Sequence, residues 1–134
     1  MPIQVNYLDN GIGIEIIASG IVTGAEIIDA HEEIYNEENL KRQKYQIVDR
    51  TCCTQYQVYA EEIEVIAELD NRASEENPDI IIAVVSPTSL QFGMTRMWQA
   101  YLKENRLNTK IFPTREKADT WIRSYLNSQF TPGN

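Results

Sequence analysis

The chain has 134 residues, of which 43% are hydrophobic and 24% are charged. This composition excludes a largely disordered chain, and the length predicts one domain with a sizeable core. The formal net charge of −8, from 20 acidic and 12 basic residues, argues against nucleic acid as a partner, because binding to phosphate backbones depends on lysine and arginine.

The sequence has no features of a membrane or secreted protein. It contains no apolar run of about 18 residues, the length that a membrane-spanning helix needs. Residues 1–11 also lack the basic start and the apolar middle of a signal peptide. We therefore expect a cytoplasmic protein without a membrane span.

Two alternating segments open the chain. Apolar side chains recur at every second position in residues 3–8 and 12–16, which is the period of a β-strand. Asn10 and Gly11 lie between the two segments and are typical of a tight hairpin turn. The sequence therefore predicts an amino-terminal β-hairpin.

A helix is predicted next, over residues 24–36. Thr23 and Glu26 have the spacing of a capping box, in which each side chain bonds the backbone of the other residue. A short strand is predicted over residues 44–49. The polar stretch that follows, residues 50–57, is expected to be a loop.

The second half of the chain alternates helices and strands. An amphipathic helix follows the loop, and residues 79–86 are a continuous apolar run, as in a strand covered on both faces. A helix after Thr88, a strand over residues 109–112 and a helix from Thr114 complete the order. Residues 128–134 are predicted to be a loose tail.

These elements give the order β-β-α-β-α-β-α-β-α in a single domain over residues 1–127. Right-handed crossovers make the later strands parallel, whereas the amino-terminal hairpin is antiparallel. The predicted fold class is therefore α/β, with a mixed, mostly parallel sheet and about four helices packed against it.

The helix after Thr88 contains two residues that its amphipathic pattern does not explain. Its predicted apolar face is Leu90, Met94, Met97, Trp98, Tyr101 and Leu102. Gly93 lies at the border of this face, at a cost of about 1 kcal/mol relative to alanine, and we expect it to allow close packing of the helix. Phe92 lies off the face and, with Arg96, is expected to be an interface anchor, because aromatic residues and arginine dominate binding hot spots. The alternative for Phe92 is packing under the hairpin or the preceding loop.

Cys52 and Cys53 are the only cysteines, and His31 is the only histidine. Adjacent cysteines are poorly placed to form a disulfide with each other, and these residues match no zinc-binding pattern. We predict no metal site, no cofactor and no catalytic residue, because His31 lies in the apolar face of the first helix. Arg50 beside Cys52 favours a thiolate, which leaves a thiol-based enzyme or redox sensor at the two cysteines as an alternative.

Two segments follow strands at the carboxyl edge of the predicted parallel sheet, where ligands bind in open α/β folds. Their polar side chains are candidates for a small site that holds an anion or the backbone of a partner. The candidates are Asp49, Arg50, Thr51, Cys52, Cys53, Thr54, Ser86, Thr88 and Ser89. The alternative is structural, in which Thr88 and Ser89 cap a helix and Asp49 orders its loop.

Several segments resemble one protein family. The stretch "YQIVD" before a polar loop, "FGMTRMW" within a helix and the closing "IFPTREKADTWI" are similar to the SpoIIAA-like proteins, which share the fold of STAS (sulfate transporter and anti-sigma factor antagonist) domains. The similarity extends over nearly the whole chain and includes the amino-terminal hairpin. The resemblance implies a STAS-like fold and a non-enzymatic regulatory module of bacterial type.

One feature departs from this family pattern. In the anti-sigma factor antagonists, a serine at the start of the helix after the third strand is phosphorylated, in an Asp-Ser-Ser-Gly context. The comparable place in this chain is near Gln57 or Val58 and has no serine. Thr51 and Thr54 lie a few residues earlier and accept phosphate only if the loop is shifted. The resemblance therefore implies the scaffold without the usual phosphoserine.

The sequence leads to one primary hypothesis and two alternatives. The primary hypothesis is a binding module that contacts a protein partner or a second copy of itself through the loop after Asp49 and the helix with Phe92, Gly93 and Arg96. The first alternative is a carrier of a small apolar or anionic ligand, because the fold also resembles the lipid-carrying CRAL-TRIO domains. Its pocket is then lined by Tyr59, Met94, Met97, Trp98 and Phe112. The second alternative is the thiol-based enzyme or redox sensor.

Overall fold

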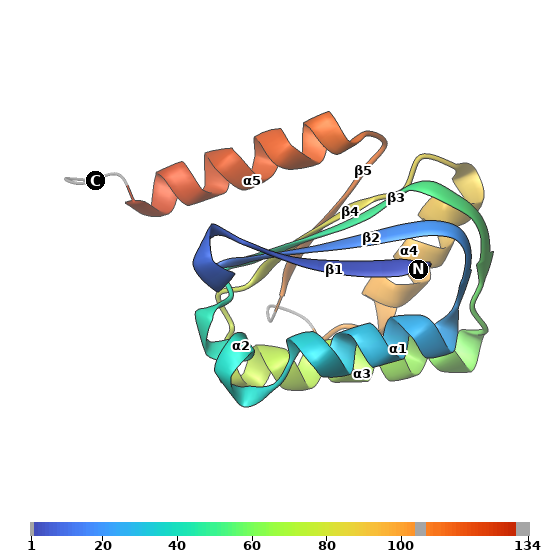
Figure 1. Ribbon diagram of the computed structural model, residues 1–134, viewed down its shortest axis with the longest axis horizontal. Helices are drawn as coiled ribbons and strands as arrows, with labels where there is room; N and C mark the ends of the chain where they lie inside the picture. Colours follow the sequence, from blue (N-terminus) through green and yellow to red (C-terminus); the bar gives the residue numbers. More distant parts are fainter. Residues whose placement is uncertain (1, 104–106, 131–134) are drawn as a thin grey trace.

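The computed structural model describes residues 2–103 and 107–130 of the chain. An opening hairpin is followed by alternating helices and strands (Figure 1). In chain order the elements are β1 (Ile3–Leu8), the short 3-10 turn η1 (Asp9–Gly11), β2 (Gly13–Thr23), α1 (Gly24–Ile34), α2 (Glu37–Arg42), β3 (Tyr45–Gln57), α3 (Ala60–Glu76), β4 (Ile81–Val85), α4 (Ser89–Tyr101), β5 (Asn108–Phe112) and α5 (Arg115–Phe130). Among the described residues, no helix combines the length and the apolar character that crossing a bilayer requires.

The strands form one five-stranded sheet in the order β1-β2-β3-β4-β5. β1 is antiparallel to β2, and the remaining neighbours are parallel. The α/β class, the mixed sheet and the amino-terminal hairpin are therefore confirmed. The turn of the hairpin requires left-handed backbone at Asp9 and Asn10, which have φ values of 52° and 59°, and asparagine and aspartate tolerate this conformation better than most residues.

Local capping signals set the start of the first two helices. The Thr23 hydroxyl accepts a hydrogen bond from the Glu26 backbone, and the Glu26 carboxylate accepts one from the Thr23 backbone, so the predicted capping box is present. α1 ends at Ile34, and a further helix, α2, follows it. The side chain of Asn36 caps α2 by accepting from the Asn39 backbone at 2.9 Å. This cap was visible in the sequence, but the short helix was not predicted.

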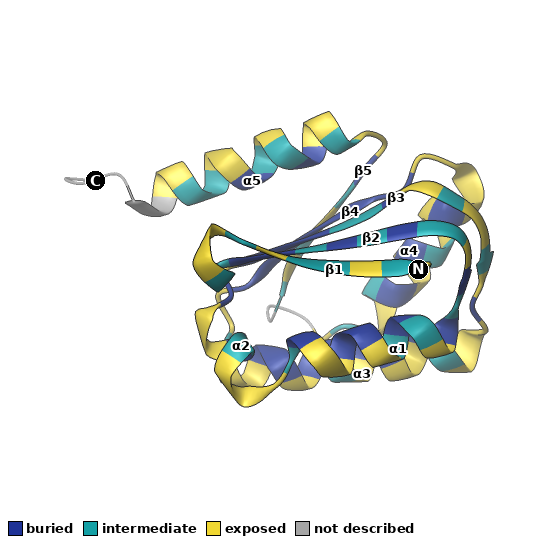
Figure 2. Ribbon diagram, viewed as in Figure 1, coloured by how far each residue is buried: buried dark blue, intermediate teal, exposed yellow. Residues whose placement is uncertain are grey.

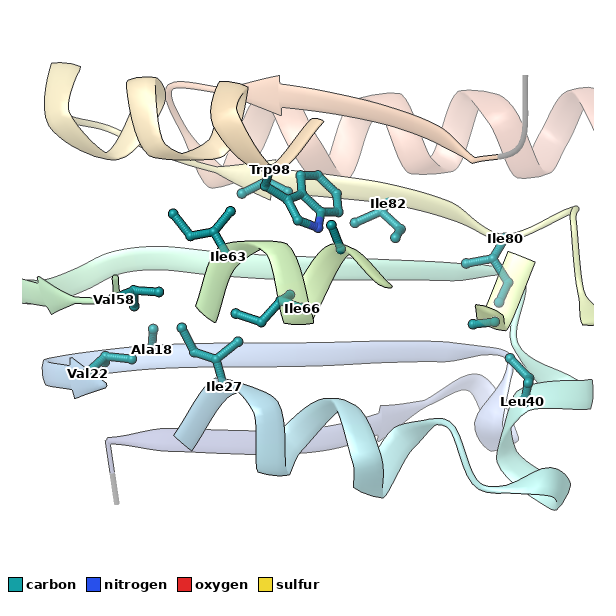
Figure 3. Packing of buried hydrophobic residues seen from close by; sticks show 13 residues of the cluster. Ala18, Val22, Ile27, Leu40, Val58, Ile63, Ile66, Ile80, Ile82 and Trp98 are labelled. Carbon is teal, nitrogen blue, oxygen red and sulfur yellow. The ribbon is translucent and has the colours of Figure 1, made fainter. Parts of the chain in front are cut away.

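The sheet lies between two layers of helices. α1, α3 and α4 cover one face, and α5 covers the other (Figure 1). All five residues of β4 are buried, as expected for a central strand covered on both faces. The larger part of the core lies on the α1, α3 and α4 side, where Ile63, Ile66 and Trp98 point toward the same interior (Figure 3). The outward sides of α1 and α3 are exposed and acidic (Figure 2).

Residues 50–57 belong to a strand, so the prediction of a loop was wrong. β3 continues along β2 as far as Gln57, whereas its pairing with β4 ends where Asp49 meets Val85. The register with β2 shifts twice, between Ile17 and Ser19 and again after Gly20, which marks β-bulges. The polar sequence reflects this position, because the outer part of β3 has only one neighbouring strand and is largely exposed.

α4 is rotated relative to the face predicted for it. Its buried side chains are Gln91, Thr95 and Trp98, whereas Leu90 is 69% exposed. A β-carbon added to Gly93 would meet no atom within 4 Å, so the expected close packing at this glycine was also wrong. Thr88 does cap the helix, because its hydroxyl accepts a hydrogen bond from the Gln91 backbone N–H. The Gln91 side chain does not complete a capping box, because it is buried, and its Oε1 has no hydrogen-bond partner among the described residues.

The carboxyl-terminal helix is longer than predicted. α5 continues to Phe130, so residues 128–130 are helical and do not belong to a loose tail. The remainder of the predicted tail, residues 131–134, lies outside the described residues. Ala118 and Ile122 are buried against the sheet and mark the inner face of this helix.

One arginine fastens the start of α5 to the sheet. The Arg115 guanidinium binds Glu15 of β2 at 2.7 Å, Asp49 of β3 at 3.1 Å and Asp119 of α5 at 2.8 Å. Burial raises the pKa of Asp49, but hydrogen bonds from Thr51 and Arg115 outweigh it and hold the pKa below its usual range. Burial also raises the pKa of Glu15, but hydrogen bonds from the Asn6 side-chain amide and from Arg115 outweigh it, and the pKa of Glu15 is lowered.

Replacing Arg115 with glutamine should lower the free energy of unfolding at pH 7 by about 2 kcal/mol, because two half-buried carboxylates lose their cation. A carboxylate with a depressed folded-state pKa stabilises the protein above its unfolded pKa of about 4, and this stabilisation is lost as the pH falls through the folded pKa. The difference between wild type and Arg115→Gln should therefore shrink at pH 3, as measured by urea denaturation. The control is Arg72→Gln, which breaks an exposed pair with Glu68 and should cost less than about 0.5 kcal/mol. A difference that stays the same from pH 7 to pH 3 would contradict this role.

Candidate functional site

The residues expected to form one polar site lie on two faces of the sheet. Asp49 points to the α5 face, where it binds Arg115 and accepts hydrogen bonds from the backbone and hydroxyl of Thr51. Arg50 points to the opposite face and is buried, with its guanidinium bonded to Thr95 of α4. The structure therefore does not bring Asp49 and Arg50 together. Asp49 holds the Thr51 backbone and hydroxyl and the Arg115 guanidinium in place, as in the structural alternative considered from the sequence.

The candidates at the start of α4 also divide into two groups. Thr88 is exposed and caps the helix, and Ser89 is its exposed first residue. Ser86 is buried instead, with its hydroxyl 3.0 Å from that of Thr95. Ser86 therefore belongs with Arg50 in the interior, and Thr88 and Ser89 belong to the surface.

The two cysteines lie in the outer part of β3, beside the exposed Thr51 and Thr54. Cys52 is exposed, and Cys53 is half-buried against the core. The register shifts in β3 bring Cys53 to the interior side of the strand, near Arg50. Burial raises the pKa of Cys53, and the attraction of Arg50 and a hydrogen bond with the Gln55 backbone offset this rise only in part. The environment of Cys53 therefore favours the thiol over the thiolate.

The outward side of α4 carries most of the exposed apolar surface near these residues. We define the α4 outer surface as Leu90, Phe92, Gly93, Arg96, Met97, Ala100 and Tyr101, all of which are exposed. Helical spacing places Leu90, Met97 and Tyr101 on the side toward α3, where the Tyr101 carbonyl accepts from Asn71. Phe92, which is 49% exposed, and Arg96 lie on the side toward β5. Gly93 and Ala100 lie between the two groups, so the backbone is open there.

The charge of α4 differs from that of the other long helices. The chain has 20 acidic residues, yet α4 contains neither aspartate nor glutamate, and Arg96 is its one charged residue. Exposed aromatic, methionine and arginine side chains without acidic neighbours are the composition typical of the centre of a protein interface. The expected exposure of Phe92 beside Arg96 is therefore confirmed, and the alternative in which Phe92 packs inward was wrong.

A buried polar cluster lies on the other side of α4. Asp70 of α3 is 0% exposed, and its carboxylate accepts from Tyr35 at 2.6 Å and from the Trp98 indole at 2.8 Å. His31 of α1 approaches the same carboxylate, with Nε2 3.4 Å from Oδ1. Asp70 therefore joins α1, α3 and α4 through one carboxyl group.

The surroundings of His31 determine its protonation. Nδ1 lies 2.9 Å from the Ile27 carbonyl, and Nε2 faces the Asp70 carboxylate, so both ring nitrogens face acceptors and both need a proton. Burial lowers the pKa of His31, but the charge and hydrogen bond of Asp70, together with the Ile27 carbonyl, outweigh it, and the pKa is raised. The geometry therefore favours the protonated form of His31 beside Asp70. His31 is buried, as its place in the apolar face of α1 predicted.

A cavity of about 40 Å³ lies between the sheet and α1, α3 and α4. The cavity is lined by apolar side chains together with those of His31, Asp70, Gln46, Arg50, Tyr56 and Trp98. Of the five residues that the carrier alternative requires, only Met94 and Trp98 reach this cavity. Tyr59 and Met97 are exposed, and Phe112 lies under α5 on the opposite face of the sheet. Binding sites for drug-sized ligands occupy roughly 300 Å³ or more, so this cavity is too small for a ligand of that size.

Comparison with known proteins adds no identification. No protein-family model matches the chain, and no curated protein matches it either. The resemblance to SpoIIAA-like proteins therefore stays a prediction from the sequence segments quoted above.

The sequence interpretation missed the buried cluster. Asp70 follows Ile63 and Ile66 at helical spacing, so a carboxylate stood within the apolar side of α3. A buried carboxylate needs hydrogen-bond donors. The single histidine, His31, also lies on the apolar face of a helix, so the sequence did offer one such donor. Trp98 and Tyr35, the other two donors, gave no comparable signal, because aromatic side chains are common in any core.

The stability of the protein should fall as the pH rises above neutrality. A histidine whose folded-state pKa is raised stabilises the protein fully below its unfolded pKa of about 6.5, and this stabilisation is lost as the pH rises through the folded pKa. The loss should be roughly 1.4 kcal/mol for each unit by which the folded pKa exceeds the unfolded one. Urea denaturation at pH 6 and pH 8.5 measures it, and His31→Gln should remove the difference. An NMR titration of the single imidazole that gives a pKa at or below 6.5 would contradict the assignment.

Proposed function

We propose that this protein is a non-enzymatic binding module of STAS-like fold, which contacts a protein partner or a second copy of itself through the α4 outer surface. The observation that carries the proposal is the inverted arrangement of α4. This helix buries Gln91 and Thr95 and exposes Leu90, Phe92 and Met97. Exposing large apolar side chains while burying polar ones is unfavourable for an isolated domain, and a partner that covers the exposed side compensates for it.

The STAS-like assignment is supported by the order of the elements. An antiparallel β1 and β2 hairpin precedes three parallel strands, and one helical layer carries α1, α3 and α4. The site comparable to the family phosphoserine falls at the junction of β3 and α3, where Gln57 is exposed and Val58 is buried. The Thr51 hydroxyl is bonded to Asp49. We therefore propose that recognition depends on the apolar surface of α4 and not on a phosphorylated residue.

The same observations favour this proposal over the two alternatives. A carrier of a lipid-like ligand needs the interior to expand well beyond a cavity of about 40 Å³. A thiol-based function needs a thiolate, whereas burial raises the pKa of Cys53. Contact with a protein needs no rearrangement, because the α4 outer surface is already exposed.

Replacing Phe92 and Arg96 with alanine should weaken binding by about 30-fold or more, because hot-spot residues contribute about 2 kcal/mol or more. The stability of the domain should stay within about 0.5 kcal/mol of wild type, since both side chains are exposed. Sedimentation equilibrium measures self-association, and quantitative capture from extracts of the source cells measures a different partner. Val65→Ala is the matched control, because Val65 is an apolar residue of α3 that is 46% exposed. If the double variant binds as well as wild type, the proposal is wrong.

Replacing Gly93 with alanine separates folding from binding. The added β-carbon meets no atom within 4 Å, and the φ of Gly93 is not positive, so the variant should be more stable by about 1 kcal/mol. The same methyl group stands where a partner approaches the open backbone, so binding should become weaker. Thermal denaturation and the binding assays above measure the two effects. A stabilised variant with unchanged binding would show that no partner approaches at Gly93.

A further inference from the structure

Arg50 is a buried cation without a carboxylate. It is 9% exposed, and its guanidinium donates to the Thr95 hydroxyl at 2.6 Å and to the Tyr56 hydroxyl at 2.9 Å. The guanidinium also stacks on the Tyr56 ring, 4.5 Å from its centre. Both partners are neutral, and no acidic side chain of residues 2–103 or 107–130 forms an ion pair with Arg50. Buried charges are normally paired, because removing an ion from water is costly.

The other charged groups around the cavity do not neutralise Arg50. Asp70 is the only carboxylate among the described residues that line it, and both of its oxygens already accept hydrogen bonds. Asp70 also forms the ion pair with His31. While His31 and Asp70 share one proton their charges sum to zero, so below the pKa of His31 the cavity lining carries a net charge of about +1 from Arg50.

The polar groups beside Arg50 have donor capacity that the protein itself does not use. The Tyr56 oxygen accepts from Arg50, and its own proton has no acceptor among the described residues. Two of the five guanidinium N–H donors bind Thr95 and Tyr56. A planar guanidinium with an adjacent hydroxyl is well suited to bind a carboxylate or a small inorganic anion.

We propose that the cavity binds a small monovalent anion, with Arg50 as its counter-ion and Tyr56 as a second donor. The volume of about 40 Å³ accommodates about three water-sized groups, which is the size of formate, nitrate or a halide. Dianions such as sulfate and phosphate are excluded, because they exceed the available charge and space. The mostly apolar walls, which include Ile66 and Ile82, allow a short organic acid to place its carbon beside them.

The test measures unfolding against anion concentration at constant ionic strength and pH. Sodium formate, nitrate and chloride should each be compared with sulfate. A ligand that binds only the folded state stabilises it with a saturating dependence on its concentration, so at least one monovalent anion should raise the Tm in this way. Formate acting more strongly than chloride indicates an organic acid as ligand, and the reverse order indicates an inorganic anion.

Two variants connect the effect to Arg50. Arg50→Gln removes the charge and should weaken anion binding by about tenfold or more, whereas Arg72→Gln removes an exposed arginine of α3 and should leave anion binding unchanged. If Arg50→Gln does not fold, Trp98 fluorescence in a Trp121→Phe background reports on the cavity of an otherwise native protein, because Trp98 lines the cavity and Trp121 belongs to α5, on the opposite face of the sheet. Saturable quenching by bromide supports the site. A response to all salts without saturation, or an equal response of Arg50→Gln and wild type, overturns it.

Discussion

The Asp70 carboxylate is the interaction on which the helical layer depends. It projects from α3 and binds His31 and Tyr35 on the α1 side and Trp98 on α4. A buried carboxylate without these donors would be strongly destabilising, so the three helices are constrained to present them together. This constraint orients α4. Once the Trp98 indole is directed at Asp70, Thr95 and Gln91 follow it inward by helical spacing, and Leu90 and Met97 are left outside.

Arg50 and Thr95 add a second constraint on the same helix. The alternation of β3 directs Arg50 toward the helical layer, as it does Gln46 and Val48, and the Arg50 guanidinium reaches the Thr95 hydroxyl there. That hydroxyl donates to the Gln91 carbonyl and lies beside Ser86. Directional polar contacts therefore add to the apolar packing of Met94 and Trp98 along the inner side of α4. The exposed apolar residues of α4 remain free for contact with another molecule, and the interior next to Arg50 remains positively charged.

The features that were predicted correctly depend on residues close in sequence. The hairpin with Asn10, the capping box at Thr23 and the apolar run of β4 are local signals, and each is present in the structure. The features that were missed depend on contacts between distant residues. The pattern of α4 contains two overlapping stripes at helical spacing, and contacts with Asp70 and Arg50, both far away in the sequence, favour burial of one of them. Likewise, residues 50–57 are strand because β2 lies beside them, which their own polar composition does not indicate.

The position of Asp70 within the chain also sets an order of assembly. When the protein is synthesised from its amino terminus, the hairpin, α1 and the first part of β3 emerge before the carboxylate that His31 and Tyr35 require. Until α3 is complete, the buried side of α1 has an imidazole and a hydroxyl without the Asp70 carboxylate that they bind, so the early segments gain little from closing on one another. Trp98 joins later still. The amino-terminal half is therefore a poor candidate for an independent folding intermediate, and the helical layer forms as a unit once α4 is available.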